Sequence, residues 1–417
     1  MTCPNSLPLP VCRACGAELS DIFVDLGLSP VSNAFIKQED AVRGEVFLPL
    51  VARVCRQCWL VQLDRVERPD SLFTDDYVYF SSCSTSWVEH ARRFVEQVTA
   101  RFALGRGSFV VEIAANDGYL LQWFVQAGIP CLGIEPTTNT AAAARARGVP
   151  VREVFFGRAT AAELAGEGRR ADLIIGNNVL AHVPDLHDFV GGLPLLLATD
   201  GVVSFEFPHL LALIRGVQFD TIYHEHYSYL SLTALQPVFA RAKLRVFDVE
   251  RLPTHGGSLR LLLCHATARH GETSAVRALL AEEAAAGLTR SETYAAFGEK
   301  VRESKRALLE YLIAAKRAGR RIAAYGAAAK GNTLLNYCGI RTDFIDCVAD
   351  ANPTKQGRLL PGTRIPVVAP EEIFRLRPDD LLILPWNLRD EIVEQMAGIR
   401  AWGGRFVLPV PRVALLP

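Results

Sequence analysis

Residues 223–229 read Tyr-His-Glu-His-Tyr-Ser-Tyr and place two imidazoles, one carboxylate and three phenols in seven consecutive positions. Side chains of these types can bind a metal ion, transfer a proton, or hold a polar turn by aromatic packing. A metal site would use His224 and His226 on one face of an extended chain, but its remaining ligands are not identified. The three interpretations are open at this point.

Four of the ten cysteines stand in two Cys-x-x-Cys pairs, formed by Cys12 with Cys15 and by Cys55 with Cys58. Each pair bends the backbone so that two thiolates converge, and two such knuckles complete a tetrahedral zinc site. The 39 residues between the pairs exceed the usual ribbon spacing, so a small insert must bridge them. Four thiolates leave no open coordination position, and the zinc is therefore predicted to be structural. A redox pair or unrelated thiols are the alternatives.

A polar loop follows a buried strand within residues 109–124 (FVVEIAANDGYLLQWF). Doubly wound folds bind nucleotide-like ligands at this place, although Ala114 and Ala115 stand where the dinucleotide fingerprint needs glycines. The next strand ends about 20 residues on at Glu135, whose carboxylate can accept both hydroxyls of a ribose. This order of strand, E-x-x-x-N-D-G, helix, strand and Glu resembles the S-adenosylmethionine site of class I methyltransferases. A helix cap at Asp117 beside an exposed Glu135 is the alternative.

The resemblance implies a cofactor site at the carboxyl ends of three strands, the third of which runs into GNNVLAHVPD. His182 lies at the same edge, over the cofactor. The expected cofactor residues are Glu112, Ala114, Asn116, Asp117, Gly118, Glu135, Asn177 and Asn178.

Three loops near the C-terminus carry lysine, asparagine and arginine after strands: GAAAKGNT, DANPTKQG and PWNLR. Because they follow strand carboxyl ends, they are expected to meet in one crevice. Lys330, Lys355 and Arg389 are then placed to hold a diphosphate, helped by backbone N–H groups at a helix start. The order of residues is not that of a P-loop. Ordinary surface turns are the alternative.

The elements that position these groups form three regions. Residues 1–75 hold the cysteine pairs and are predicted to be a zinc-binding lobe. Residues 76–245 alternate buried strands (FVVEI, CLGIE, DLIIG, VVSFEF) with Ala-rich helices, which predicts a parallel, doubly wound, Rossmann-like sheet. Residues 246–417 begin with two strands and a long charged helical stretch that Gly319 ends. The strands RIAAYG, DFIDCVAD, DDLLILPW and RFVLPV then predict a smaller Rossmann-like α/β domain.

Composition excludes several classes of function. The 417 residues fit two or three domains, half of them are hydrophobic, and the formal net charge is zero. No nucleic acid or anionic membrane is suggested as a partner. No apolar run approaches the roughly 18 residues of a membrane helix. The start lacks the basic and apolar regions of a signal peptide, so a cytoplasmic location is expected. A monomer is expected because one chain supplies both binding domains.

Taken together, these motifs resemble the sugar C-methyltransferases of deoxysugar biosynthesis over nearly the whole chain. The resemblance rests on the cysteine lobe, EIAANDG, YHEHYSY, GAAAKGN, NPTKQGRLLPGTRIP and LPWNLRDEI, which are specific in combination although not singly. It implies S-adenosylmethionine-dependent methylation of a nucleotide-linked (dTDP) 4-keto deoxysugar, chiefly at C-3′. Family members differ between C-3′ and C-5′, and no residue here that we can identify sets that choice.

Methylation beside a ketone needs a base, a partner for the enolate oxygen and a methyl group in line with the carbanion. The resemblance supports His226 as the base, with His224 as the second choice. Tyr223 and Glu225 are expected to position the sugar or orient the base, and His182 to contact the oxygen. The expected substrate residues are Tyr77, Tyr79, Lys330, Gly331, Asn332, Asn352, Lys355, Asn387 and Arg389.

Two other classes of function compete with this hypothesis. An NAD-dependent oxidoreductase using the C-terminal domain would need an acidic residue after the second strand, where Asp350 stands, but it has Lys330 where glycine is preferred. A non-catalytic zinc-ribbon interaction protein would not need the two histidines of residues 223–229.

Overall fold

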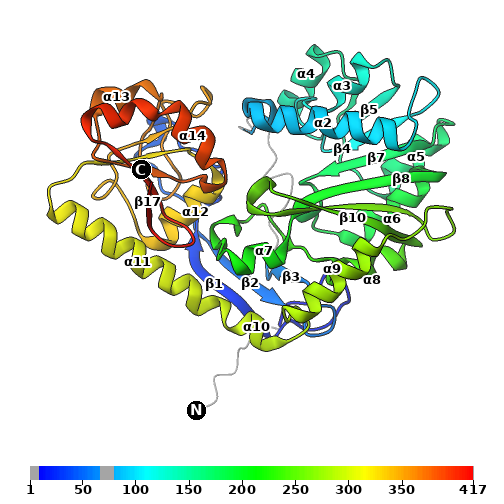
Figure 1. The fold of residues 1–417 in the computed structure, drawn as a ribbon, viewed down its shortest axis with the longest axis horizontal. Helices are drawn as coiled ribbons and strands as arrows, with labels where there is room; N and C mark the ends of the chain where they lie inside the picture. Colours follow the sequence, from blue (N-terminus) through cyan, green and yellow to red (C-terminus); the bar gives the residue numbers. More distant parts are fainter. Residues whose placement is uncertain (1–8, 66–78, 417) are drawn as a thin grey trace.

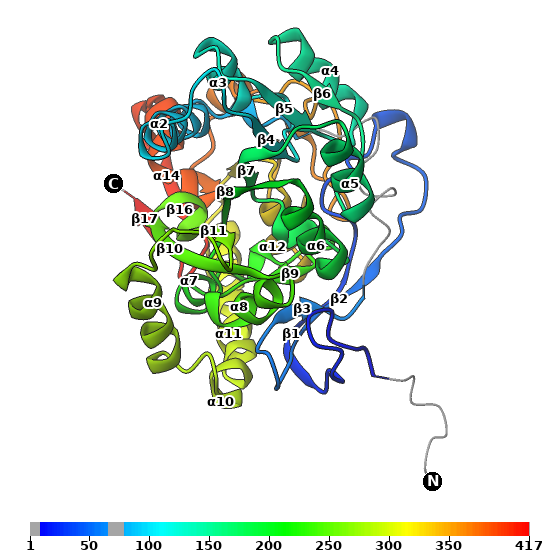
Figure 2. The same ribbon diagram turned by 90° about the vertical axis from the view of Figure 1, so that its right-hand side faces the viewer.

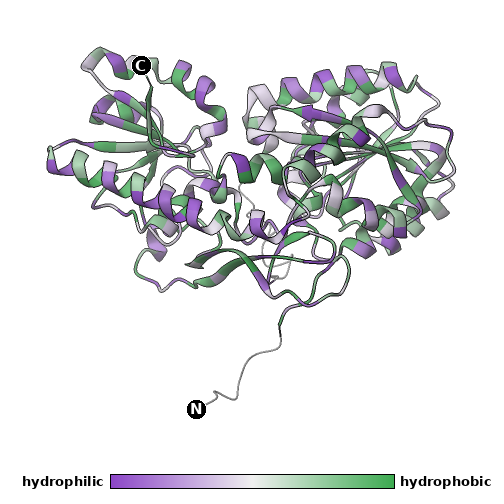
Figure 3. Cartoon of the chain, turned by 60° about the horizontal axis from the view of Figure 1, so that its bottom comes forward, coloured by the Kyte–Doolittle hydropathy of each residue, from purple (hydrophilic) through white to green (hydrophobic). Residues whose placement is uncertain are grey.

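The computed structural model describes residues 9–65 and 79–416, which form an N-terminal lobe, a central domain and a C-terminal domain (Figure 1). The lobe lies beneath and between the two larger parts (Figures 1 and 3). Tyr77 and the predicted boundary after residue 75 fall outside the described residues. Within the described ranges, no helix combines the length and apolarity needed to cross a bilayer.

The lobe contains a small antiparallel sheet in the order β1-β2-β3-β9. Three strands come from the lobe: β1 (Asp21–Ser29), β2 (Leu48–Val54) and β3 (Val61–Leu63). The fourth, β9 (Ser228–Tyr229), comes from the end of the YHEHYSY segment and lies beside β3 (Figure 2). In this pairing Ser228 lies opposite Gln62 and Tyr229 opposite Val61. The proton-handling segment predicted from the sequence is therefore built into the lobe sheet.

The central domain is a seven-stranded sheet in the order β10-β11-β8-β7-β4-β5-β6. The strands from β8 to β6 are parallel, whereas β11 runs antiparallel to both neighbours. This confirms the doubly wound sheet predicted from the alternating pattern. The strands are β4 (Val110–Ile113), β5 (Cys131–Ile134), β6 (Val151–Arg152), β7 (Ala171–Asn177), β8 (Leu197–Pro208), β10 (Leu244–Leu252) and β11 (Ser258–His265).

The helices of this region are α2 (Thr85–Arg101), α3 (Leu121–Gln126), α4 (Thr138–Ala146), α5 (Arg158–Gly166), α6 (Leu186–Leu196), α7 (Leu210–Arg215) and α8 (Leu232–Arg241). The predicted boundary between residues 245 and 246 falls inside β10. Strands β10 and β11 pair with β8 and so complete the central sheet, although the sequence pattern grouped them with the C-terminal domain.

The C-terminal domain begins with three helices, α9 (Ser274–Ala285), α10 (Ser291–Ala295) and α11 (Phe297–Arg317). Gly319 ends α11 with a φ of +73°, as predicted. The sheet order is β14-β13-β12-β15-β16-β17, parallel except for β17. Its elements are β12 (Ile322–Tyr325), α12 (Ala329–Cys338), β13 (Val348–Ala349), β14 (Val367–Val368), α13 (Glu371–Leu376), β15 (Asp380–Ile383), α14 (Arg389–Gln395), β16 (Arg405–Leu408) and β17 (Ala414–Leu416).

The lobe contacts both larger domains. Phe23 of β1 stacks on Phe297 of α11 with 4.3 Å between ring centroids. On the other side, the carbonyl of Ala14 accepts hydrogen bonds of 2.9 Å from His187 of α6 and from Arg241 of α8. Helix α11 alternates hydrophilic and hydrophobic residues along its length (Figure 3), and its apolar residues pack into the shared core. The lobe is thus fixed between the two domains.

Candidate active site

One cavity of about 730 Å³ brings together most of the predicted site. Its volume is in the range of small-molecule sites. Its walls come from the lobe (Asn33), from the central domain (Glu135, His226) and from the C-terminal domain (Lys330, Lys355). Of the predicted residues, the cavity is lined by Tyr79, Ala114, Asn116, Glu135, Asn177, Asn178, His182, Tyr223, Glu225, His226, Lys330 and Lys355.

The four cysteines form the predicted metal centre. Their Sγ atoms all lie within 4.8 Å of one another, with 3.5 Å between Cys12 and Cys58 and 3.4 Å between Cys15 and Cys55. Four sulfurs bound to one zinc lie about 3.8 Å apart, so the arrangement fits a structural zinc ion. No other group of three or more His, Cys, Asp or Glu in residues 9–65 and 79–416 is compact enough for a metal. The metal interpretation of residues 223–229 is therefore not supported.

The two histidines of the segment lie in different surroundings. His226 and Tyr223 are half-buried and line the cavity, whereas His224 is 4% exposed and is absent from the cavity wall. The ring of His224 contacts the carbonyl of Pro49 at 3.3 Å, in the lobe. Of the two, only His226 can meet a ligand in the cavity without rearrangement.

The hydrogen bonds of His226 define its proton state. Its Nδ1 lies 2.8 Å from the carbonyl of Thr221, which can only accept, so Nδ1 carries the proton. Its Nε2 then accepts from the hydroxyl of Tyr223 at 2.7 Å. Burial lowers the pKa of His226 well below its ordinary value, and the nearby His182 lowers it further. The imidazole is therefore neutral, with a basic nitrogen beside the Tyr223 hydroxyl.

Glu225 and His182 support this pair from two sides. Glu225 accepts a hydrogen bond of 2.6 Å from the amide of Asn33, and burial raises the pKa of Glu225 to about 7. The ring of His182 lies edge-on to His226 with centroids 4.7 Å apart. A hydrogen bond to the backbone of Glu225 raises the pKa of His182, but burial dominates and lowers it to about 4. Asn33, which reaches the segment from the lobe, was not predicted because no motif surrounds it.

The predicted cofactor loop lies between β4 and α3. Ala114, Asn116 and Gly118 have positive φ values of 57°, 49° and 76°, which turn the backbone tightly over the strand end. A Cβ atom at Gly118 would lie 3.1 Å from Ala144 of α4, so glycine permits this close approach. The amide of Asn116 donates to Glu135 Oε2 at 2.8 Å, which joins the loop to the end of β5. The two predicted parts of the cofactor site thus contact each other.

The loop is surrounded by negative charge. Glu112 is 1% exposed, and neither of its carboxylate oxygens has a hydrogen-bond partner among the described residues. Burial raises the pKa of Glu112 well above its ordinary value, and the charges of Asp117 and Glu135 raise it further. A ligand that carries a sulfonium and an ammonium group would relieve this excess. The loop therefore fits S-adenosylmethionine, although Glu112, Asp117 and Gly118 themselves do not line the cavity.

Lys330 reaches the cavity from the start of α12. Its Nζ donates to Asn387 at 2.6 Å and lies 4.7 Å above the ring of Trp386. Trp386 in turn donates to Asp220 at 2.7 Å, close in sequence to residues 223–229. Burial raises the pKa of Asp220 to about 6, although the charge of Lys330 opposes this. Neither Asp220 nor Trp386 was predicted from the sequence, because they become partners only when the two domains meet.

The other predicted substrate residues are distributed unevenly. Lys355 lines the cavity, but its Nζ already donates to the carbonyl of Ala327 at 2.9 Å. Arg389 is exposed, pairs with Asp390 and lies away from the cavity wall. Gly331, Asn332, Asn352 and Asn387 are also absent from that wall. The carboxylate of Asp350 accepts the backbone amides of Ala327 and Asn352, each at 2.8 Å, and Asp350 is absent from the cavity wall, which gives no support to an NAD site.

Two further groups of cavity residues were missed. Val154, Phe155 and Phe156 follow β6, and their apolar side chains gave no signal distinct from a core. His255 lies in a short turn between β10 and β11. The two glycines after His255 could have indicated this site, because successive glycines often mark an unusual backbone conformation.

The comparisons with known proteins agree with this arrangement. Three family models match successive parts of the chain: "Putative zinc binding domain" at residues 12–73, "Methyltransferase domain" at 87–249 and "C-methyltransferase C-terminal domain" at 253–411. The C-methyltransferase NovU of Streptomyces niveus is 38% identical over 407 residues, which cover 97% of this chain and 96% of NovU. The ubiquinone biosynthesis O-methyltransferase of Rhodopseudomonas palustris is 27% identical over 97 residues, 23% of this chain and 38% of that protein.

Among solved structures, the magnesium protoporphyrin IX methyltransferase of Synechocystis with bound SAH is 16% identical, covers 43% of this chain and 82% of its own, and gives a TM-score of 0.34. A SAM-dependent methyltransferase from Anabaena variabilis is 13% identical. The match covers 49% of this chain and 99% of that protein, with a TM-score of 0.36.

The central sheet, the loop after β4 and the match at residues 87–249 define a class I S-adenosylmethionine-dependent methyltransferase with a zinc-binding lobe. Because it aligns with NovU over almost its full length and matches the C-methyltransferase C-terminal domain, the chain belongs to the C-methyltransferase family.

Proposed function

We propose that the enzyme methylates a carbon next to the ketone of a nucleotide-linked 4-keto deoxysugar, at C-3′ rather than C-5′, in deoxysugar biosynthesis. The observation that carries this proposal is the shared cavity, which the cofactor loop, the Tyr223–His226 pair and Lys330 all reach. Proton abstraction, methyl donation and anion binding are the three requirements of such a reaction. A cytoplasmic location, a monomeric state and thymine as the base of the nucleotide remain predictions.

In this mechanism His226 is the base. Its neutral Nε2 removes the proton from the carbon next to the ketone, the C–H electron pair forms a C=C bond, and the carbonyl oxygen becomes an enolate. The Nδ1 bond to Thr221 fixes the tautomer. Because Nε2 has a single lone pair, the hydroxyl of Tyr223 must turn its hydrogen away from Nε2 when the substrate binds. The lowered pKa of His226 keeps the ring neutral before the proton arrives.

The cofactor supplies an electrophilic methyl group at a sulfonium. In the proposal, Asn116, Glu135 and Asn178 line the space that holds it, and Glu135 accepts the ribose hydroxyls. The neutral ring of His182 is placed near the reacting oxygen by its edge-on contact with His226. The enolate carbon would take the methyl group as the bond from sulfur to the methyl carbon breaks and leaves its electron pair on the sulfur of S-adenosylhomocysteine; the ketone would form again, and the proton would remain on His226.

Lys330 is the strongest candidate for the diphosphate. It is a half-buried cation on the cavity wall, and its partner is a side-chain amide, that of Asn387, which can yield to a ligand. Arg389 would have to move from the surface to take part, and Lys355 would have to leave Ala327. The nucleotide half of the substrate is therefore expected beside α12.

The test combines two readouts on a panel of nucleotide-linked 4-keto-6-deoxysugars. Transfer of labelled methyl from S-adenosylmethionine measures the full reaction, and uptake of solvent deuterium at the carbon next to the ketone, in the presence of S-adenosylhomocysteine, isolates the proton step. Exchange and transfer at the same carbon are expected. Absence of both with every sugar would refute the proposed substrate class, and the labelled position separates C-3′ from C-5′.

A further inference from the structure

The turn between β10 and β11 holds His255 in an unusual backbone conformation. His255, Gly256 and Gly257 have successive positive φ values of 52°, 84° and 118°. A left-handed conformation at a residue with a side chain costs on the order of 1 kcal/mol, and such residues concentrate at functional sites. Glycine or asparagine would adopt this conformation at lower cost, so the turn alone does not require histidine.

Contacts from several elements hold this turn in place. The amide of Gln218 donates to the carbonyl of Gly256 at 2.8 Å, and the backbone N–H of His209 donates to that of Gly257 at 3.0 Å. A Cβ atom at Gly256 would lie 2.3 Å from the ring of Trp386, so the C-terminal domain packs directly on the backbone. The turn is therefore fixed between two domains.

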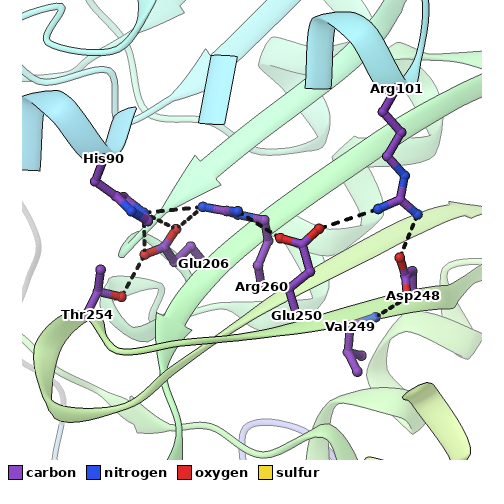
Figure 4. Close-up of polar contacts among 8 residues, drawn as sticks. All are labelled: His90, Arg101, Glu206, Asp248, Val249, Glu250, Thr254 and Arg260. Carbon is purple, nitrogen blue, oxygen red and sulfur yellow. Dashed lines mark hydrogen bonds and ion pairs between the residues drawn. The ribbon is translucent and has the colours of Figure 1, made fainter. Parts of the chain in front are cut away.

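A largely buried ionic network holds the turn through Thr254 (Figure 4). Glu206, fully buried near the end of β8, accepts a hydrogen bond of 2.9 Å from the hydroxyl of Thr254. The same carboxylate contacts His90 of α2 at 2.9 Å and Arg260 of β11 at 2.7 Å. Arg260 continues to Glu250 at 2.9 Å. Burying these charges costs free energy, but the bonds restrict the position of residue 254 and hence of the next residue.

The ring of His255 has one nitrogen engaged and one available. Its Nε2 lies 3.1 Å from the side-chain amide nitrogen of Asn178, which donates, so the proton of a neutral ring sits on Nδ1. Burial lowers the pKa of His255 to about 4, which keeps the ring neutral. In the described part of the chain Nδ1 makes no hydrogen bond, and the residue lines the cavity that also contains Tyr223 and His226. His255 thus brings to the cavity wall a rigidly held N–H donor that has no acceptor among the described residues.

We propose that His255 is a further catalytic residue, which donates a hydrogen bond from Nδ1 to the substrate oxygen that becomes an enolate when His226 removes the proton. This inference rests on the proposed function. A neutral imidazole is suited to the task because it stabilises the developing charge without a proton transfer of its own. His182 already hydrogen-bonds the backbone of Glu225, so a second donor completes the environment of the oxygen.

Two variants of nearly equal size test whether position 255 must donate a hydrogen bond or need only fill the space of the side chain. His255→Asn keeps an N–H donor and tolerates the left-handed backbone, whereas His255→Asp tolerates the same backbone but offers only acceptors. We expect the Asn variant to keep solvent deuterium exchange within about 10-fold of wild type. We expect the Asp variant to lose about 10²- to 10³-fold, the effect of removing one such donor. The half-buried His270 provides the control, since it is absent from the cavity wall and His270→Asp adds the same charge there.

Binding of S-adenosylmethionine, measured by calorimetry, should be unchanged in both variants, and the loss should fall on the rate and not on the KM for the sugar. His255→Gly relieves the backbone strain and removes the donor, so it should be as slow as the Asp variant although it is well folded. Equal exchange rates in the Asn and Asp variants would overturn the assignment, as would weaker cofactor binding in both. If wild type itself exchanges no proton on any sugar, the proposed function fails, and this assignment fails with it.

Discussion

The guanidinium group of Arg13 donates a hydrogen bond to the backbone carbonyl of Tyr227, within the segment that carries the proposed base. Another nitrogen of the same group donates to the carbonyl of Leu63 on β3 at 2.9 Å. Arg13 lies between the metal ligands Cys12 and Cys15, so zinc binding fixes the backbone from which its side chain extends. The zinc site is therefore connected to the proposed base through a single side chain.

Replacing Arg13 should lower catalysis without loss of the metal. Arg13→Met removes hydrogen bonds to two backbone carbonyls, and we expect solvent exchange to fall about 10-fold. Zinc content by mass spectrometry should stay at one ion per chain. Arg56→Met, on the lobe surface where Arg56 pairs with Asp21, should leave exchange unchanged. Equal exchange rates in the two variants would show that the connection does not influence the base.

The two histidines of the segment should differ sharply. His226→Ala removes the proposed base and should lower exchange by about 10²- to 10⁴-fold, the usual contribution of a general base. His224→Ala should keep exchange within about 10-fold and lower the free energy of unfolding by about 1 kcal/mol, because His224 contacts Pro49 away from the cavity. The opposite order of exchange rates would move the base to His224.

Glu225 should make stability depend on pH. Its pKa rises from an ordinary 4.5 to about 7 in the folded protein, so the folded state keeps a proton that the unfolded state releases between these values. This stabilisation is present below pH 4.5 and is lost as the pH rises through 7. Glu225→Gln cannot ionise, and it should be more stable than wild type by up to about 3 kcal/mol near pH 8, with little difference near pH 4.5. The measurement is the free energy of unfolding of both proteins at the two pH values. An equal difference between the two proteins at pH 4.5 and pH 8 would contradict the prediction, because it would mean that the carboxyl group titrates at its ordinary pKa.

Glu135 should govern cofactor affinity. Glu135→Gln replaces a charged acceptor of the ribose hydroxyls, and we expect the Kd for S-adenosylmethionine to rise about 10- to 100-fold in calorimetry. Glu153→Gln is the matched control, because Glu153 is exposed and pairs with Arg145. An unchanged Kd in the Glu135 variant would place the ribose elsewhere.

The C-terminal cations should differ in their effect on nucleotide binding. With thymidine diphosphate as the probe, Lys330→Met should raise the Kd about 10-fold or more, because it removes a charge-assisted hydrogen bond at the cavity wall. Arg389→Met should bind as wild type does, since Arg389 is exposed and paired with Asp390. A loss confined to the Arg389 variant would mean that α14 moves over the ligand.

Patterns local to one strand or one loop were predicted well from the sequence. The cysteine spacing gave the zinc site, and the order of strands and polar loops gave the central sheet, because both depend on short segments with strong periodicity. The predicted boundary between residues 245 and 246 falls inside β10, because the sequence of a hairpin strand does not show which sheet it joins.

Contacts between regions were not predictable in the same way. Asn33 meets Glu225, and Asp220 meets Trp386, across intervals of 192 and 166 residues. Neither pair has a local spacing that distinguishes it from ordinary polar surface residues. The grouping of Arg389 with Lys330 rested on strand ends alone, and the side chain of Arg389 turns to the surface instead.

The pairing of β3 with β9 has a consequence for recombining such enzymes. In a chimaera that exchanges only a continuous central stretch, β9 would come from one enzyme and β3 from the other. The side chains of β9 would then pack against residues of a different protein. The smallest unit that could be exchanged with this pairing intact consists of two separate pieces. They are the lobe up to residue 63 and the central segment that ends at residue 230. Substrate preference should follow this discontinuous pair of pieces and not either piece alone.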